Sequence, residues 1–222
     1  MKNLTLVIPA KYEKESLPYV LDEIKNLNFR VKIILQQNDI ETIQSIKNYN
    51  IEIIYQKGSG YGNALIEGIN SVETEYFCIF NADGSFDPKE ITPMFNILVK
   101  SQGDFIFGSR YQKNSGSDDD TLITYIGNFF FTKLGRILFN LPLTDILYTY
   151  VLGKTKKFKI LNCKKNDFSF CIELPILAKR HEMKIFNYNS FERSRIGGEK
   201  KVNAFKDGFL ILKYMIYLYF KK

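Results

Sequence analysis

The sequence has little of what several classes of catalytic and structural site require. Its only histidine, His181, stands among charged residues in AKRHEM, which is typical of a surface position rather than of a catalytic one. The three cysteines, Cys78, Cys163 and Cys171, are scattered, odd in number and without metal-binding spacing. We therefore expect reduced structural thiols in a cytoplasmic protein, with Cys78 in a core strand, and neither a cysteine metal site nor a disulfide framework.

Long apolar runs and leader-like segments are absent as well. No run approaches the ~20 residues that cross a bilayer, and no early stretch combines a basic flank, an apolar core and a small-residue cleavage site. We expect a cytoplasmic protein, or one held peripherally on the inner face of the plasma membrane. Residues 56–62, QKGSGYG, fit neither the Walker spacing nor GxGxxG. Their glycines offer backbone N–H groups to a phosphate or make a tight turn.

Composition indicates the size of the core and the charge of the partner. The 222 residues are 45% hydrophobic, enough for a sizeable core in one large domain or in a domain with an appendage. The net charge of +7 predicts an anionic partner: a nucleotide, a lipid headgroup or a nucleic acid. Nothing but charge supports a nucleic acid, so we do not expect one.

Short apolar runs alternate with amphipathic stretches through the first half of the chain. This pattern predicts an α/β fold with a doubly wound, mostly parallel sheet and right-handed crossovers. Ser16 is expected to cap the first helix. The expected strands cover residues 4–8, 31–35, 51–55, 76–80 and 105–107, and the expected helices cover residues 16–28, 40–49, 62–72 and 88–101.

Oxygen-bearing side chains, Asn81, Asp83 and Ser85, gather directly after the fourth expected strand. Ligands of open α/β sheets bind past the carboxyl ends of the strands, and hard oxygen ligands there suit Mg2+ or Mn2+ held against a diphosphate. We expect Asp83 as the main metal ligand, supported by Asn81 and Ser85. Polar loops 9–15 and 36–39, after the first two strands, should meet this loop at one edge, as a nucleotide site needs. The alternative is an Asx turn that caps the next helix.

Seven motifs, in order, resemble those of family 2 glycosyltransferases. VIPAKYEKESLP resembles the family's VIPAYNEEENL, KGSGYGNALIEGI its KGxGxAlxxGi, and FNADGSFDP its mDADgxxdP, which holds the DxD metal motif. The later segments DFIFGSRY, PLTDILYTYV, FCIELPILAKRHEMKI and RSRIGGEKKVNAFKDGF also resemble family motifs. The resemblance covers nearly the whole chain, and the dolichol-phosphate mannose and polyprenyl-phosphate sugar synthases are the subgroup that it resembles most.

The resemblance implies a GT-A fold and inverting transfer of a sugar from a nucleotide diphosphate sugar to a lipid-phosphate or glycan acceptor, assisted by Mg2+ or Mn2+. Tyr12 would stack on the base, and Asp39 would accept from ribose hydroxyls or cap the following helix. The residues implied for nucleotide binding are Pro9, Ala10, Tyr12, Glu13, Gln37, Asp39, Lys57, Asn81, Ala82, Asp83, Arg195 and Lys201.

Charged residues after the later strands are candidates for the chemistry. By resemblance, Arg110 ends a strand at the site, while Arg195 and Lys201 lie in a glycine-bearing loop, and their positive charge suits a developing diphosphate. Asp145 and Glu173 are the acid candidates. We expect Asp145 near the acceptor, as general base if the acceptor is a hydroxyl. Glu173 is expected in a supporting role, at a helix N-terminus.

The chain departs from the family pattern in three places. Gln36 and Gln37 stand where the family usually has paired acids, Asn81 replaces the first Asp of DxD, and the glycine expected near Thr149 is missing. An amide oxygen ligates a cation without adding charge, so metal affinity should fall. Two alternatives stay open: a weakened or inactive nucleotide-sugar-binding relative, and a sugar-phosphate nucleotidyltransferase, whose own N-terminal glycine-rich signature is missing here.

The second half of the chain supplies the expected acceptor side. We expect a GT-A domain over residues 1–203, with a nucleotide-binding half at 1–111 and an acceptor half at 112–203. Within the acceptor half, residues 118–120 are expected in a solvated, mobile loop. Residues 204–222 predict an amphipathic helix whose tyrosines and terminal lysines are typical of docking on a membrane that holds the acceptor. Packing of this helix on its own domain is the alternative.

Overall fold

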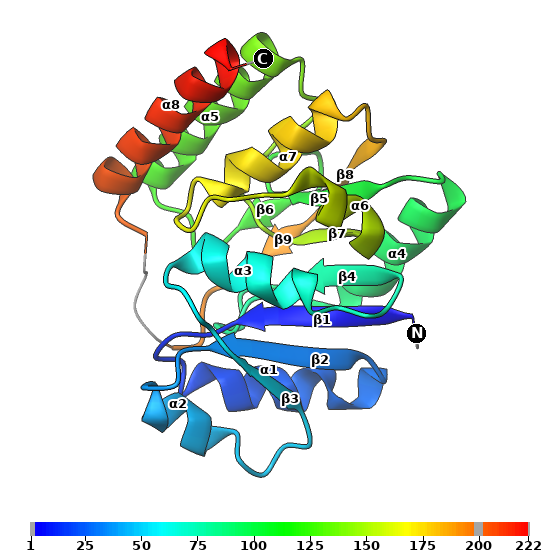
Figure 1. Cartoon of the computed structure of the whole chain (residues 1–222), viewed down its shortest axis with the longest axis vertical. Helices are drawn as coiled ribbons and strands as arrows, with labels where there is room; N and C mark the ends of the chain where they lie inside the picture. The colour runs from blue at the N-terminus through cyan, green and yellow to red at the C-terminus, as the bar shows by residue number, and fades with distance from the viewer. Residues whose placement is uncertain (1–2, 198–201, 222) are drawn as a thin grey trace.

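A seven-stranded sheet with helices on both faces forms the centre of the molecule (Figure 1). The computed structural model describes residues 3–197 and 202–221. The strand order is β3-β2-β1-β4-β7-β5-β8, and β7 alone in this sheet runs antiparallel to its neighbours among the described residues. The predicted α/β class with a mostly parallel sheet is confirmed. The strands are β1 Leu4–Pro9, β2 Arg30–Leu35, β3 Glu52–Tyr55, β4 Tyr76–Ile79, β5 Phe105–Ser109, β7 Val151–Lys154 and β8 Ile185–Asn189.

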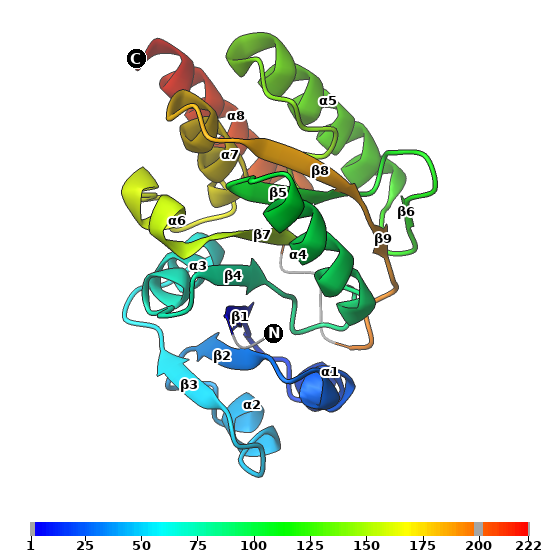
Figure 2. The same cartoon turned by 90° about the vertical axis from the view of Figure 1, so that its right-hand side faces the viewer.

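The helices divide between the two faces of the sheet. Helices α1 and α4 lie on one face, and α3, α6 and α7 lie on the other (Figure 2). Helix α5 packs on both α7 and α8. The helices are α1 Ser16–Ile24, α2 Ile40–Ser45, α3 Tyr61–Asn70, α4 Ile91–Lys100, α5 Leu122–Phe139, α6 Thr155–Leu161, α7 Phe170–Arg180 and α8 Ala204–Phe220, with short 3-10 turns η1 Lys25–Leu27 and η2 Pro88–Glu90.

Strand β4 is apolar throughout because both of its faces are covered. Its four residues are buried; Phe77 and Ile79 belong to the core on the α3 side, and Tyr76 and Cys78 belong to the core on the α1 side. Successive side chains of a strand point to opposite faces, so a strand between two helical layers needs apolar residues at every position. Cys78 is a buried thiol in this strand, as predicted.

Strands β7 and β8 were not predicted from the sequence. Strand β7 has four residues, of which two are Gly153 and Lys154, and β8 includes Asn187 and Asn189. Such short runs with polar or glycine positions give little periodic signal. Strand β7 nevertheless fills the gap between β4 and β5, where Leu152 pairs with a residue of each.

The start of α1 also differs from the prediction. Ser16 is the first residue of the helix rather than its cap, and its hydroxyl donates to Glu13 Oε2 at 2.7 Å. The capping role predicted for Ser16 is therefore wrong. The serine instead fixes a carboxylate that belongs to the loop after β1.

A second, two-stranded sheet joins distant parts of the chain. Its strands are β6, Gly116–Ser117, and β9, Phe191–Glu192, which run parallel. The pairing continues into the Asp118 N–H, which donates to the carbonyl of Glu192 at 2.8 Å. This short ladder sets the loop after β6 beside the chain that follows β9.

Helix α8 packs on its own domain, which is the alternative weighed for the C-terminal segment. It lies along α5 (Figure 1), with Ile211, Met215 and Leu218 buried. Arg180 donates to the carbonyl of Leu218, and the Tyr214 hydroxyl donates to Glu173 at 2.5 Å. None of the helices in the described ranges has the length and apolar character that a bilayer crossing requires.

Candidate active site

A pocket of about 660 Å³ lies past the carboxyl ends of β1 and β4. Its walls come from the loops after these strands, the start of α3, the chain around Arg110, and the facing helices α5 and α8. This is where ligands bind in open α/β sheets, and the volume falls in the usual range for a small-molecule site. The strand-end rule used on the sequence therefore located the hollow correctly.

The loop after β4 presents Asp83 and Asn81 to this pocket. The Asp83 carboxylate accepts from the Ser85 N–H at 3.0 Å, in an Asx turn that Gly84 completes with a φ of 82°. Asn81 donates its amide to the Ser85 hydroxyl at 3.2 Å. Ser85 itself is buried and does not line the pocket. Its predicted place among the metal ligands is wrong, because its hydroxyl holds Asn81 in position instead.

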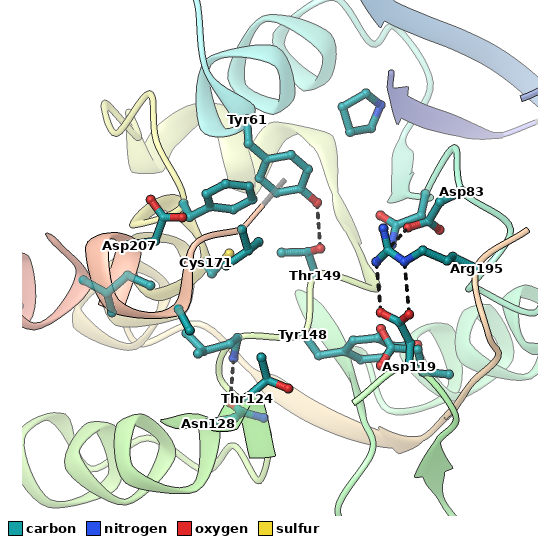
Figure 3. Close-up of a pocket in the computed structure, with 18 of the residues that line it drawn as sticks. Tyr61, Asp83, Asp119, Thr124, Asn128, Tyr148, Thr149, Cys171, Arg195 and Asp207 are labelled. Atoms are coloured by element: carbon teal, nitrogen blue, oxygen red, sulfur yellow. Dashed lines mark hydrogen bonds and ion pairs between the residues drawn. The ribbon is translucent and has the colours of Figure 1, made fainter. Parts of the chain in front are cut away.

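Arg195 bridges two carboxylates in the pocket wall (Figure 3). Its guanidinium donates to both oxygens of Asp119, at 3.0 and 2.9 Å, and one of its nitrogens lies 3.8 Å from Asp83. Hydrogen bonding to Asp119 raises the pKa of Arg195, although its partial burial opposes this. Asp119 belongs to the loop that was expected to be solvated and mobile. The pairing of β6 with β9 brings it to Arg195 instead.

Arg110 lies in the pocket wall at the centre of a buried charge network. Its guanidinium donates to both oxygens of Asp145, at 2.7 and 3.1 Å, and to Glu192 at 3.0 Å. It also lies 4.6 Å from the centroid of the Tyr148 ring. Burial alone would lower the pKa of Arg110, but the charges of Asp145 and Glu192 outweigh it and raise that pKa above its ordinary value. The cation is therefore permanent, as predicted, but it is already balanced by carboxylates.

Asp145 and Glu173 do not line the pocket, contrary to their expected roles near the acceptor. Asp145 is 0% exposed, and its oxygens accept from Arg110 and from the Asn128 amide at 2.5 Å. Glu173 lies in the first turn of α7, as predicted, but accepts there from the N–H groups of Lys164 and Lys165 and from a tyrosine hydroxyl. Both carboxylates hold protein groups in place.

The residues expected to bind the nucleotide separate into two groups. Those that line the pocket are Pro9, Ala10, Glu13, Asn81, Ala82, Asp83 and Arg195. Those outside the lining are Tyr12, Gln37, Asp39 and Lys57, and Lys201 falls outside the described residues.

Asp39 has a structural role that explains its place outside the pocket. It caps α2, accepting from the Thr42 N–H, and it accepts from the Tyr12 N–H at 2.7 Å. Of the two roles left open for Asp39, helix capping is therefore the one observed. Tyr12 has a positive φ of 56° and is exposed.

Several lining residues were given no site role from the sequence. Gln36, which follows β2, was noted only in a polar loop and as a departure from the family's paired acids, and Gln56, which follows β3, only as the start of a glycine-rich stretch. The hydroxyls of Tyr61 and Thr149, both in the pocket lining, form a hydrogen bond of 2.7 Å (Figure 3). Cys171 also lines the pocket; burial raises its pKa to about 12, so its thiol stays protonated at neutral pH.

The metal-binding oxygens in the pocket are suited to a divalent cation only if a bound ligand supplies further oxygens. Within residues 3–197 and 202–221, no group of three His, Cys, Asp or Glu side chains could hold a metal. Asp83 and Asn81 supply hard oxygens, which suit Mg2+ or Mn2+. Mg2+ is commonly held by one or two carboxylates together with substrate phosphates and water. These residues therefore fit a metal that arrives with a diphosphate.

A family model described as glycosyl transferase family 2 matches residues 5–161. The chain belongs to glycosyl transferase family 2. This confirms the resemblance that the seven motifs indicated. The match covers all the strand-end loops of the first half, including the Asn81–Asp83 loop.

Curated relatives agree with the family assignment. A low-salt glycan biosynthesis hexosyltransferase, Agl6, from Haloferax volcanii is 20% identical over 96% of this chain, which spans 53% of that protein. A UDP-N-acetylglucosamine–dolichyl-phosphate N-acetylglucosaminyltransferase from Methanococcus voltae is 21% identical over 83% of each chain.

Solved structures confirm the GT-A fold. Glucosyl-3-phosphoglycerate synthase from Mycobacterium tuberculosis, crystallised with Mn2+, UDP and glucosyl-3-phosphoglycerate, has a TM-score of 0.76. The two are 11% identical, over 98% of this chain and 80% of that one. At 11% identity the similarity shows the fold alone, and the ligands are those of the mycobacterial enzyme.

The position of Asp145 predicts a stability effect rather than a loss of a catalytic base. Asp145→Asn should lower the free energy of unfolding by about 3–5 kcal/mol, because it leaves the buried Arg110 cation undercompensated. Glu41→Gln, which breaks the exposed Lys14–Glu41 pair, is the matched control and should cost at most about 1 kcal/mol. Urea denaturation of both variants measures this. Wild-type stability with lost turnover in Asp145→Asn would return Asp145 to the role of a base.

Proposed function

We propose that this chain transfers a sugar, with inversion, from a nucleotide diphosphate sugar to a lipid-phosphate or glycan acceptor. The observation that carries the proposal is the meeting of Asp83, Asn81, Arg110 and Arg195 in one pocket past the strand ends. Family membership supports the reaction class. The UDP and Mn2+ of the mycobacterial synthase support a nucleotide diphosphate as the donor's leaving group.

The nucleotide end of the pocket is the wall made by β1 and β2. Pro9 and Ala10 follow β1, and Gln36 follows β2. Their backbone and amide groups are suited to the base and ribose, and Gln36 carries no charge where the family usually has an acid. Asp83 and Arg195 line the same pocket, and we expect the diphosphate of a bound nucleotide to lie beside them.

Asp83 and Asn81 would hold the divalent cation. When bound, the metal supplies positive charge that stabilises the departing diphosphate. Arg195 provides a second positive charge on the same side of the pocket. We infer that Arg195 exchanges its bonds to Asp119 for bonds to the diphosphate, since guanidinium groups match phosphate oxygens in the same two-pronged geometry.

We favour an acceptor that is already an anion, because the carboxylates of the pocket are engaged in hydrogen bonds rather than available as a general base. Those in the lining are Glu13, Asp83, Asp119, Asp120, Glu192 and Asp207, and each accepts hydrogen bonds from other groups of the chain. A hydroxyl acceptor needs a general base, whereas a phosphate acceptor does not. The dolichyl-phosphate acceptor named for the Methanococcus voltae relative has this chemistry.

The exposed side chains of helices α5 and α8 are largely apolar, which would suit a membrane surface; we call them together the outer face. The basic residues in these helices and directly after α8 are Lys133, Arg136, Lys206, Lys213 and Lys221, and Asp207 is the one acid in the two helices. The exposed apolar residues are Leu122, Ile123, Tyr125, Ile126, Phe129, Phe130, Ile137, Phe205, Phe209, Ile216, Tyr217, Tyr219 and Phe220. Aromatics with lysines are typical of interfacial helices. We propose that this face docks on an anionic membrane that carries the acceptor.

The donor part of the proposal predicts metal-dependent nucleotide binding. Nucleoside diphosphates should raise the melting temperature more with Mn2+ than without, because a ligand that binds only the folded state stabilises it by mass action. Asp83→Asn should lose the Mn2+-dependent part. Asp87→Asn, which alters only the cap of η2, should keep it.

A thermal-shift screen over UDP, GDP, CDP and dTDP measures this. Absence of stabilisation by every nucleotide, with and without Mn2+, would contradict the proposed donor site. Nucleotide binding without release of nucleoside diphosphate from any sugar donor would identify an inactive relative.

The membrane part predicts salt-sensitive binding to anionic vesicles. The double variant Phe209→Glu, Phe220→Glu should float with phosphatidylglycerol vesicles at least severalfold less than wild type, because it puts charge into the apolar face. Each lysine near such a surface contributes about 1 kcal/mol, so raised salt should weaken binding. Tyr19→Glu, on the exposed side of α1, is the control. Equal flotation of all three proteins would rule out this docking face.

A further inference from the structure

Two hydroxyl groups meet in the pocket lining from parts of the chain that lie 88 positions apart. Tyr61 is the first residue of α3, and Thr149 stands in the chain that leads into β7. Thr149 lies between the group formed by Asp83 and Arg195 and the side of the pocket that carries Cys171 (Figure 3). The hydroxyl pair is therefore next to the charged end of the pocket without being part of it.

The pair has hydrogen-bonding capacity that the protein does not use. Either hydroxyl can donate to the other across 2.7 Å, and the described part of the chain contains no further hydrogen bond of either hydroxyl. Two hydroxyls carry two donors, and their mutual bond uses one. One O–H donor and several oxygen lone pairs remain for a ligand. The carboxylates and arginines of the lining, in contrast, already have partners in the protein.

The surroundings of the pair are largely apolar. The Tyr61 ring stacks on Phe168, with the ring centroids 5.0 Å apart, and Ala64 and Cys171 also line the pocket. Burial raises the pKa of Tyr61 well above its ordinary value, so its phenol stays neutral. In such surroundings a ligand that lacks the matching group leaves a buried hydroxyl unsatisfied, which is costly. Because the pair carries no positive charge, it is better suited to a neutral hydroxyl of a ligand than to a phosphate.

Close backbone packing fixes the place of Tyr61. A Cβ atom at Gly60 would lie 2.2 Å from the Asn166 carbonyl oxygen, and one at Gly62 would lie 2.1 Å from that of Lys165. Glycine at these two positions lets the start of α3 lie directly against the chain that leads into α7. The phenol is therefore held in position before a ligand arrives, as a site that discriminates between ligands requires.

We infer that the hydroxyl pair of Tyr61 and Thr149 binds a hydroxyl group of the donor's sugar and thereby selects which sugar is transferred. This inference rests on the proposed function and deepens it. The sugar of a nucleotide sugar is bonded directly to the diphosphate, so its ring must lie beside the group that receives the diphosphate. Thr149 stands there, next to Asp83 and Arg195 (Figure 3).

Thr149 also sets this chain apart from the pattern of its family. The family pattern has a glycine near this position, and glycine offers neither a hydroxyl nor a methyl group to a ligand. Sites built to bind a substrate hydroxyl reject analogues that lack it far more strongly than apolar sites reject a change in size. We therefore expect a sugar preference that differs from that of relatives with the glycine.

Calorimetry on the full chain with Mn2+ tests the inference by separating the sugar from the nucleotide. The probes are UDP, UDP-glucose, UDP-galactose, UDP-N-acetylglucosamine, GDP and GDP-mannose. The quantity compared is the affinity for each nucleotide sugar divided by the affinity for its own nucleoside diphosphate. For the nucleotide sugar that wild type binds best, Tyr61→Phe and Thr149→Val should each lower this ratio about tenfold. The affinity for the nucleoside diphosphate should stay unchanged.

Two further variants serve as controls. Thr149→Ser keeps the hydroxyl and should keep the ratio of wild type. Tyr49→Phe removes a phenol hydroxyl that donates to the Pro18 carbonyl at 3.1 Å, outside the pocket lining, and should change neither affinity. If Tyr61→Phe and Thr149→Val weaken the nucleotide sugar and the nucleoside diphosphate by the same factor, the pair only supports the fold and the inference is overturned.

Deoxygenated donors identify the hydroxyl that is bound. One monodeoxy analogue of the preferred nucleotide sugar should bind wild type about tenfold more weakly than the parent does. Tyr61→Phe or Thr149→Val should bind this analogue and the parent equally, because the variant has already lost the partner of the missing hydroxyl. Equal losses in wild type and in both variants for every analogue would contradict the inference.

The same measurements separate this inference from the proposed function. If nucleoside diphosphates bind with Mn2+ while the ratio is the same in wild type, Tyr61→Phe and Thr149→Val, the inference fails and the transferase proposal stands. If neither a nucleoside diphosphate nor a nucleotide sugar binds to wild type, the transferase proposal fails and the inference fails with it.

Discussion

The buried ion pair between Arg110 and Asp145 is the interaction on which the second half of the molecule depends. Arg110 follows β5, and Asp145 stands in the chain that leads to β7. The same network ties in Asn128 of α5 and Glu192 of β9. An isolated charge is too costly to bury, so these elements must assemble together. Their assembly fixes where α5 lies, and α5 in turn supports α8 and one wall of the pocket.

The arginines of the pocket wall are charge-balanced by carboxylates of the chain itself. Arg110 is matched by Asp145 and Glu192, and Arg195 is matched by Asp119 and Asp83. The two arginines differ in how readily they can exchange their carboxylate partners. Arg110 is held on several sides and stays in place, whereas Arg195 sits in the loop after β9 and shares carboxylates that a cation could take over. An incoming metal and diphosphate would replace Arg195 at Asp83 and receive its guanidinium, so the net charge of the site changes little.

The sequence predicted the first half well because its signals are local. An apolar run followed by oxygen-bearing residues predicts a strand end at a ligand site, and Pro9, Ala10, Asn81 and Asp83 lie there. The errors came from contacts between residues far apart in the chain. No residue near Asp145 in the sequence indicates that Arg110, 35 positions earlier, donates hydrogen bonds to both of its carboxylate oxygens.

The prediction for Asp119 was wrong in the opposite sense, because a residue expected in solvent lies in the pocket wall. Its loop has the composition of a solvated segment, and only the pairing of β6 with β9 brings it to Arg195, 76 positions away. Glu173 shows the limit of helix-end reasoning. Its place in the first turn of α7 was predictable, but the N–H groups and the tyrosine that consume its oxygens were not.

The most direct measurement is a structure of the protein with a nucleoside diphosphate and Mn2+. We expect the metal on Asp83, the diphosphate beside it, and the guanidinium of Arg195 on phosphate oxygens rather than on Asp119. A nucleotide bound elsewhere, or bound in the pocket with Arg195 still paired to Asp119 and no metal at Asp83, would contradict the central claim that this pocket is built to hold the diphosphate of an activated sugar.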